Sequence, residues 1–126
     1  MRYALYDSVT GAITQWGYGE PPPGRSFITH AFEGSLADYY VQPADKSLRP
    51  KLPMTLSWPA SAPAGTEAVI AGLPAGTKCD FYIDRLPYHA EVDDGALELT
   101  VLLPETVRIR FWHPQYHHDP IEVRFT

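Results

Sequence analysis

The chain has 126 residues, with 10 basic and 15 acidic side chains and a net charge of −5. This length makes one domain, or one domain with a small appendage, and it can bury enough surface to fold without staples. The acidic excess argues against nucleic-acid binding, because acidic surfaces repel phosphate groups. No apolar stretch reaches the about 18 residues of a membrane span, so we expect no membrane insertion.

Cys79 is the single cysteine, so an intramolecular disulfide is excluded. Its place on an apolar alternating face predicts a small core side chain. The first residues, Met1 to Asp7, lack the long apolar run of a secretory signal. We therefore expect a protein that is made and kept in soluble form.

The N-terminal residues predict a β-hairpin. Arg2–Tyr6 is a short aromatic strand, Asp7–Gly11 supplies turn residues with a glycine for positive φ, and Ala12–Tyr18 returns. A two-stranded hairpin is marginally stable in water, so its apolar side chains need a partner surface. That surface is either the rest of the chain or another protein.

Two further short strands are expected before residue 43. Pro21–Gly24 stops regular structure, and Ser26–His30 follows as a strand. Asp38–Val41 is predicted as a strand because it is aromatic and β-branched. The competing prediction there is a helical turn over Ser35–Tyr40, with Ser35 as its cap.

Residues 43–65 hold five of the 13 prolines and are expected to form an extended, semi-rigid strap. Within it, Met54–Trp58 can pair as an edge strand, where flanking prolines are tolerated. The predicted organisation is a hairpin and docking region at 1–42, a proline-rich strap at 43–65 and a β-sandwich domain at 66–126.

The last part of the chain alternates apolar and polar residues with period two in four segments. Successive side chains of a strand point to opposite faces, so each segment has one buried and one wet face. In the second segment, residues 96–103, Val101 and Leu103 are also predicted to point inward. The predicted core comprises Cys79, Phe81, Ile83, Leu97, Leu99, Val107, Ile109, Phe111, Val123 and Phe125.

Turn residues separate these segments at intervals of about ten residues, the spacing of a sandwich. Leu73–Gly76 is a turn, Asp93–Gly95 is a hairpin turn of the Asp-Gly type, and Pro104–Glu105 joins the next two strands. We expect an all-β chain whose domain is a small antiparallel β-sandwich, similar to immunoglobulin or fibronectin domains.

Histidines form the first candidate for chemistry. His113, His117 and His118, with Asp119, are ligand types for zinc or another transition metal. Prolines on both sides place them in a loop between strands, which denies them the common face that a helix would give. The prediction is a polar loop tip without a metal.

Paired carboxylates form the second candidate, because two acids that flank a cleft can hydrolyse glycosides. Asp80 and Asp84 lie on the solvent side of one strand, and Asp93 and Asp94 in a turn. Calcium binding by the turn pair lacks the ligand spacing of a dedicated loop. Turn chemistry and solvation account for these acids, so we expect no catalytic residue, no cofactor and no metal.

Exposed aromatic side chains are the remaining candidates, because Tyr and Trp anchor protein interfaces or stack on sugar rings. Alternation points Tyr82 and Trp112 away from the core. The alternative for most of the aromatics is that they cover the core of a small domain. The predicted interface residues are Tyr3, Trp16, Tyr18, Tyr39, Tyr40 and Trp112.

The order of several motifs resembles small proteins encoded in the tail regions of tailed bacteriophages and prophages. Tyr3–Asp7 and Thr10–Ile13 match an aromatic strand and a "Y-D-x-x-T-G-x-I" hairpin. A tyrosine-valine element at Tyr39–Val41 and a proline-rich strap at Pro50–Pro53 follow.

The same resemblance extends through the last part of the chain. Leu73–Thr77 matches "L-P-x-G-T", Asp93–Gly95 matches a "D-D-G" hairpin, and Ile121–Phe125 matches a final strand. The chain departs from the pattern at Pro104–Thr106, where such proteins often have glycine-tyrosine before the penultimate strand.

The resemblance implies a virion or assembly setting. The small hairpin, the strap and the compact sandwich are suited to strand addition at a neighbour's sheet edge, so we expect a non-enzymatic structural protein of a phage tail tip, baseplate or tail fibre that contacts other tail proteins. Several copies per particle are expected, because tail components surround a symmetry axis, and the chain would assemble in the host cytoplasm and remain in the virion tail. Residues 1–65 are expected to dock and 66–126 to face solvent. The alternatives are a carbohydrate-binding module that recognises host-surface glycans through exposed aromatics, and a small hydrolase that uses the acidic pairs.

Overall fold

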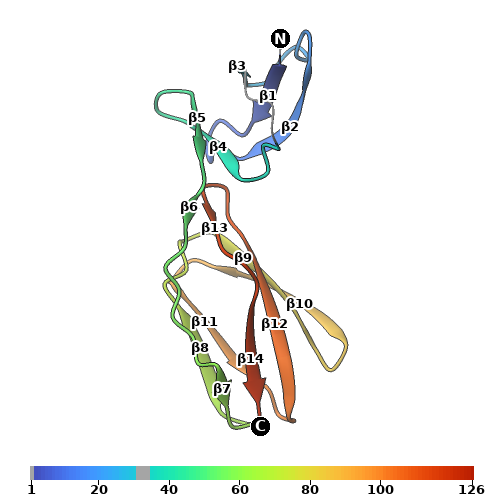
Figure 1. Cartoon of the computed structure of the whole chain (residues 1–126), viewed down its shortest axis with the longest axis vertical. Helices are drawn as coiled ribbons and strands as arrows, with labels where there is room; N and C mark the ends of the chain where they lie inside the picture. Colours follow the sequence, from blue (N-terminus) through green and yellow to red (C-terminus); the bar gives the residue numbers. More distant parts are fainter. Residues whose placement is uncertain (1, 31–34) are drawn as a thin grey trace. The chain divides into compact units, whose positions relative to one another are not determined.

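The computed structural model describes residues 2–30 and 35–126, which form β-strands joined by turns and loops (Figure 1). The prediction of an all-β chain with antiparallel sheets is confirmed. The described residues contain no helix that is long and apolar enough to cross a membrane. The chain divides into two compact units, Met1–Leu52 and Pro53–Thr126.

The first unit contains a three-stranded sheet in the order β2-β1-β3, formed by β1 (Arg2–Tyr6), β2 (Ile13–Tyr18) and β3 (Phe27–His30). The predicted hairpin and the strand after it are therefore present. Asp7 holds the hairpin turn, because its carboxylate accepts the backbone N–H groups of Val9 and Thr10. These hydrogen bonds, Thr10 first, lower the pKa of Asp7.

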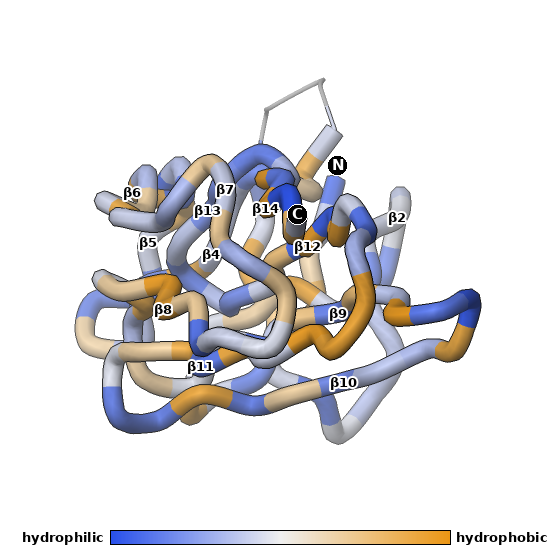
Figure 2. The backbone as a smooth tube through the Cα atoms, turned by 90° about the horizontal axis from the view of Figure 1, so that it is seen from below, coloured by the Kyte–Doolittle hydropathy of each residue, from blue (hydrophilic) through white to orange (hydrophobic). Residues whose placement is uncertain are grey.

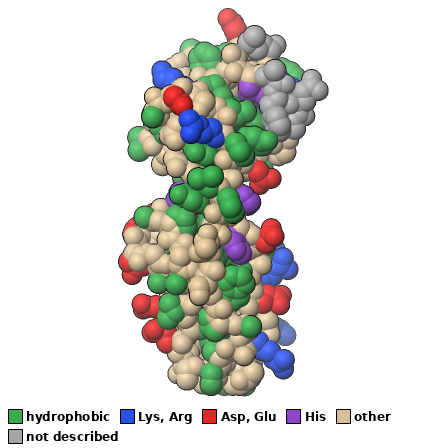
Figure 3. Space-filling view, turned by 60° about the vertical axis from the view of Figure 1, so that its left-hand side comes forward, with side chains coloured by type: hydrophobic (Ala, Val, Ile, Leu, Met, Phe, Trp, Pro, Cys, Tyr) green, Lys and Arg blue, Asp and Glu red, His purple; other side chains and the backbone are tan. Residues whose placement is uncertain are grey.

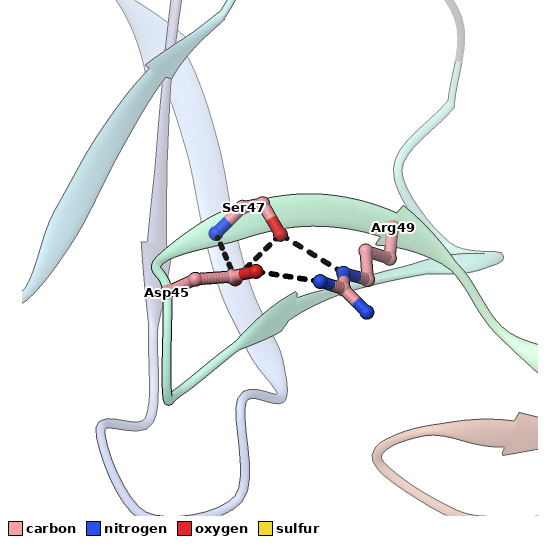
Figure 4. A network of polar contacts seen from close by, with 3 residues as sticks. All are labelled: Asp45, Ser47 and Arg49. Carbon is pink, nitrogen blue, oxygen red and sulfur yellow. Dashed lines mark hydrogen bonds and ion pairs between the residues drawn. The ribbon is translucent and has the colours of Figure 1, made fainter.

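A second hairpin in this unit pairs β4 (Tyr39–Gln42) with β5 (Ser47–Pro50). The strand at Tyr39–Gln42 is the predicted one, and the helical turn is not adopted. The start of the expected strap is instead a paired strand. The turn between β4 and β5 is fixed by Asp45. Its carboxylate accepts hydrogen bonds from the backbone N–H and the hydroxyl of Ser47 and forms an ion pair with Arg49 (Figure 4).

The N-terminal hairpin has its partner surface within the same unit. Gly11 lies so close to β4 that an added Cβ would meet the Val41 carbonyl oxygen at 2.0 Å. The Val41 N–H donates to the Gly11 carbonyl at 2.9 Å. Glycine is required here by both the close approach and its positive φ of 80°. The buried hydrophobic side chains of this unit are Tyr3, Ala4, Leu5, Leu36, Tyr40 and Val41.

The second unit contains two main sheets. The larger has the order β10-β9-β12-β14-β7, and the smaller pairs β11 with β8. The strands of the larger sheet are β7 (Ser61–Ala62), β9 (Thr77–Ile83), β10 (Leu86–Val92), β12 (Glu105–Trp112) and β14 (Ile121–Phe125). The remaining strands are β6 (Leu52–Pro53), β8 (Glu67–Ala71), β11 (Ala96–Thr100) and β13 (Tyr116–His117).

The two sheets share one hydrophobic core, and period-two alternation places its side chains as predicted. Every predicted core residue is buried except Ile83 and Phe111, which are partly buried and pack against the core. Leu103 is the exception to the alternation, since it is 68% exposed. The prediction is wrong there because β11 ends at Thr100, so Leu103 lies in the following loop.

The connections between strands differ from those predicted. Asp93–Gly95 leads from β10 to β11, which lie in different sheets, so it is not a hairpin turn. The hairpin joins β9 to β10 through the two-residue turn at Asp84 and Arg85. Both have positive φ, 49° and 64°, the conformation of a type I′ turn. Similarity to immunoglobulin or fibronectin domains stays a prediction.

Residues 53–65 belong to the second unit and are not a separate strap. Met54 is buried in the core. Ser57 exchanges two backbone hydrogen bonds with Ala71, so the expected edge strand at 54–58 is reduced to one bridge. The short strand β7 runs parallel to the end of β14. The predicted boundaries at 42/43 and 65/66 therefore differ from the boundary between Leu52 and Pro53.

These contacts predict how fragments of the chain fold. Residues 53–126 should fold alone and give one cooperative thermal transition, because their core and both sheets are complete. Residues 66–126 lack Met54 and β7. Their free energy of unfolding should be lower by about 2–5 kcal/mol, the cost of emptying one large core site. Urea unfolding of the two fragments measures the difference. Equal stability would show that 53–65 is a strap after all.

Core position predicts the cost of two matched truncations. Phe125 is almost fully buried, so Phe125→Ala should lower the free energy of unfolding by about 3–5 kcal/mol. Phe111 is partly buried, and Phe111→Ala should cost about 1–3 kcal/mol. Guanidinium denaturation of both variants provides the comparison. A reversed order would mean that β12 and β14 are placed in the wrong register.

Candidate functional site

The predicted interface residues divide into buried and exposed groups. Tyr3 and Tyr40 are 8% and 5% exposed and belong to the core of the first unit, so they are corrected from interface to core. Gly17 leaves room for the Tyr3 ring, because a Cβ added at Gly17 would lie only 2.7 Å from the Tyr3 hydroxyl oxygen. Tyr39 is partly buried.

Trp16 and Tyr18 are exposed on β2, two residues apart and therefore on one face of the strand. Tyr18 is fixed in place by Arg2, whose guanidinium donates to the Tyr18 hydroxyl at 2.6 Å and lies 4.8 Å from the ring centre. Trp112 is exposed on β12 as alternation predicts, with the Lys78 ammonium 5.3 Å from its ring centre.

The histidines do not converge on one point. His113 is buried, its Nδ1 accepts the Gln115 N–H at 3.0 Å, and its Nε2 lies 2.9 Å from the Ala75 carbonyl. Because Nδ1 accepts, Nε2 carries the proton and donates. His118 packs edge-on against aromatic rings, while His117 is exposed. No group of three metal-ligand side chains occurs among residues 2–30 and 35–126.

The carboxylates likewise serve separate local contacts. Asp80 lies 2.5 Å from Nδ1 of His89 on the neighbouring strand. The backbone N–H of Asp84 donates to the Glu105 carboxylate at 2.9 Å, which ties the β9–β10 turn to β12. Asp94 accepts the backbone N–H that starts β11. Asp80, Asp84 and Asp94 therefore each make a separate local contact, and none of these contacts joins two aspartates.

Cys79 is fully buried, as expected for a core side chain. Burial, with a smaller contribution from the Asp80 charge, raises the pKa of the Cys79 thiol to about 11. The thiol is therefore protonated at neutral pH. A protonated, buried thiol is a packing group, because the thiolate is the nucleophilic form.

One surface feature of the second unit is a largely apolar groove with a volume of about 620 Å³, which Asp84, Arg85 and Glu105 also line. It lies between the end of the β9–β10 hairpin, at Ile83 and Tyr88, and the loop after β11. Leu102 and Leu103 line it and are 78% and 68% exposed. In Figure 2 the tube is hydrophobic on both sides of the hydrophilic β9–β10 turn. Leucine and tyrosine side chains are therefore clustered here in contact with water.

The groove exists because the smaller sheet has two strands and the larger has five. Tyr88 alternates with outward residues and stacks on the core residue Phe81, with ring centres 5.8 Å apart. It thus points to the core side of β10, yet it remains 44% exposed. The inner face of β10 is incompletely covered at the hairpin end.

Sequence analysis missed this groove, although one signal was available. Leu102 and Leu103 are consecutive leucines, and both cannot point to the core of one strand. Their neighbour across the groove is the β9–β10 hairpin, which the sequence did not predict because Pro87 interrupts its second strand.

Comparison with known proteins gives no match, whether with protein-family models, with curated sequences or with solved structures. Function is therefore argued from the surface of the chain and from the order of its sequence motifs.

The His113 contacts predict a structural role that can be measured. His113→Ala should lower the free energy of unfolding by about 1–3 kcal/mol, because it leaves the Gln115 N–H and the Ala75 carbonyl without their partner. His117→Ala is the control and should change it by less than about 0.5 kcal/mol, since that side chain is exposed. Urea denaturation decides. Equal effects would rule out the anchoring role of His113.

Proposed function

We propose that this chain is a non-catalytic structural protein of a bacteriophage tail tip, baseplate or tail fibre, which acts by protein–protein contacts. The contact role is supported by the apolar groove, whose leucines are exposed to water in the single chain. Exposed apolar surface that is rimmed by polar residues is typical of grooves where a partner binds, and Asp84, Arg85 and Glu105 form such a rim here. The tail setting is supported by the order of motifs along the sequence.

The occupant that we propose for the groove is an extended segment of a neighbouring tail subunit. β11 pairs with β8 on one side only, and Thr100 at its end lines the groove. A segment added to the open edge of β11 gains backbone hydrogen bonds. Its alternate side chains would point toward Tyr88 and the leucines, because successive side chains of a strand alternate in direction.

The open edge of β10 is less suited to strand addition. Across a two-residue hairpin turn, Ile83 and Leu86 exchange hydrogen bonds, so residues 87, 89 and 91 turn their backbone groups outward. Pro87 has no N–H to donate at this edge. β11 contains no proline and offers an uninterrupted edge. The difference favours β11 as the docking strand.

The first unit offers a second contact surface through Trp16 and Tyr18. We propose that this surface also meets a tail protein, so that both units dock and docking is not confined to the expected residues 1–65. Tail components surround a symmetry axis, and several copies per particle follow from that arrangement. The chain would assemble in the host cytoplasm and remain in the virion.

The direct test of the proposed function is quantitative mass spectrometry of purified particles from the phage or induced prophage that encodes the chain. A structural protein must copurify with the particle in a fixed number of copies. Absence of the chain from particles that are otherwise complete would contradict the proposal.

The groove predicts the outcome of one double substitution. Leu102→Asp with Leu103→Asp should reduce the chain in particles at least tenfold, which corresponds to about 1.4 kcal/mol, because two carboxylates would enter an apolar contact. Both side chains are exposed, so circular dichroism and the melting temperature should stay close to wild type.

The matched control adds the same charge elsewhere. Ser8 and Val9 are exposed in the β1–β2 turn, and Ser8→Asp with Val9→Asp should leave incorporation unchanged. Normal incorporation of a folded groove variant would refute the groove as the contact surface, while the chain's presence in particles would still support the tail function.

A further inference from the structure

The second unit is acidic, yet its basic side chains are gathered on one sheet. All five belong to the larger sheet or to its β9–β10 turn, while the smaller sheet carries Glu67 and Glu98 and no basic residue. Figure 3 shows the separation in this unit, with basic side chains at one margin and acidic ones alone at the other. The five basic residues are Lys78, Arg85, Arg108, Arg110 and Arg124.

On the outer face of the larger sheet, one cross-strand row runs through three strands. His89 on β10 faces Asp80 on β9, and Asp80 faces Arg110 on β12. Asp80 and His89 are joined at 2.5 Å. In the next row toward the hairpin turn, Tyr82 lies opposite Pro87 and is 64% exposed. The face thus presents an acceptor, an imidazole and an aromatic ring side by side.

Two arginines on this face have carboxylates on the neighbouring strands but form no ion pair with them. Arg108 and Arg110 are exposed, and neither forms an ion pair with any residue in the described part of the chain. Glu122 lies opposite Arg108 in the β12–β14 register without forming an ion pair with it. Arg108 and Arg110 lie two residues apart on the same face of β12, so one anionic ligand can accept hydrogen bonds from both guanidinium groups.

A hollow joins these side chains into one site. Its volume is about 350 Å³, at the lower end of the about 300–1,000 Å³ of small-molecule sites. The outer-face residues that line it are Asp80, Tyr82, Pro87, His89, Arg108 and Arg110.

We infer that this hollow binds a carboxylated saccharide. The paired N–H groups of the Arg108 and Arg110 guanidinium groups can donate hydrogen bonds to the two oxygens of a carboxylate. The Asp80 carboxylate and His89 match sugar hydroxyls, which both donate and accept. The exposed ring of Tyr82 offers an apolar face to one side of a sugar ring. The inference stands independently of the tail function.

A peptide fits this face less well than a saccharide. The backbone groups of β9 and β12 pair with neighbouring strands along these rows, so the face offers side chains only. Extended peptides gain affinity mainly from backbone hydrogen bonds at a sheet edge. A saccharide needs no such edge, since its hydroxyls and carboxylate all meet side-chain groups.

The test titrates the full chain by calorimetry with four probes. Tri-galacturonic acid and 3′-sialyllactose are the acidic saccharides, maltotriose is the neutral one and hexaglutamate is an acidic peptide. At least one acidic saccharide should bind at least tenfold more tightly than maltotriose and hexaglutamate. Binding of neither acidic saccharide, or equally tight binding of hexaglutamate, would overturn the inference.

Two pairs of variants separate the hollow from general charge. Arg108→Gln with Arg110→Gln should weaken binding of the acidic saccharide at least tenfold. Arg85→Gln with Arg124→Gln removes the same charge from the same unit outside the hollow and should change affinity less than twofold. Equal losses in the two variants would show nonspecific attraction and defeat the assignment.

A second pair tests the aromatic contact. Tyr82→Phe keeps the ring, so its affinity for the acidic saccharide should stay within about threefold of wild type. Tyr82→Ala removes the stacking surface, so its affinity should fall at least tenfold. The side chain is exposed, so both variants should fold normally. A folded Tyr82→Ala variant with full affinity would overturn the proposed geometry.

Discussion

The unequal width of the two sheets in the second unit sets most of its surface properties. Five strands face two, so the smaller sheet covers the core side of the larger one only in part. Where both sheets meet, residues such as Ile70 and Val107 are fully buried. Beyond that region Tyr88 shields Phe81, and Leu102 and Leu103 remain in water. The same mismatch produces the groove and leaves β11 with an open edge, so the contact surface and the edge that would hold a partner share one cause.

The two units gain stability in different ways. The second relies on a contiguous core drawn from both sheets, in which Phe125, Ile109 and Val123 are almost fully buried. The first is small and depends on close backbone approach, which Gly11 permits against β4, and on the turns that Asp7 and Asp45 hold by hydrogen bonds. Short sheets of this kind bury little surface per residue, and specific turn chemistry compensates. The outer face of the larger sheet is then left for charged and aromatic side chains.

Period-two alternation predicted the strands and most of the core, because side-chain direction in a strand is a local property. It could not predict which strands pair. Asp93–Gly95 has the composition of a hairpin turn but connects two sheets, whereas the actual turn at Asp84 and Arg85 has no glycine to signal positive φ.

The candidate sites were harder to predict than the strands. Tyr3 and Tyr40 were expected at an interface because their burial depends on residues distant in sequence, Gly17 for Tyr3 and Ala12 for Tyr40. The groove depends on the contact between the β9–β10 hairpin and the loop after β11, and the arginine hollow on side chains of β9, β10 and β12 that the sheet order brings together.

Hydrogen exchange tests most directly whether the uncovered part of the larger sheet is a docking surface. Exchange followed by mass spectrometry would compare the purified chain with the same chain in its particle. If a neighbouring segment adds to β11, the alternate amides of residues 96–100 that point away from β8 should exchange readily in the free chain. They should become protected in the particle, together with the hairpin end at 83–88. Protection confined to the first unit, with β11 unchanged, would contradict this account.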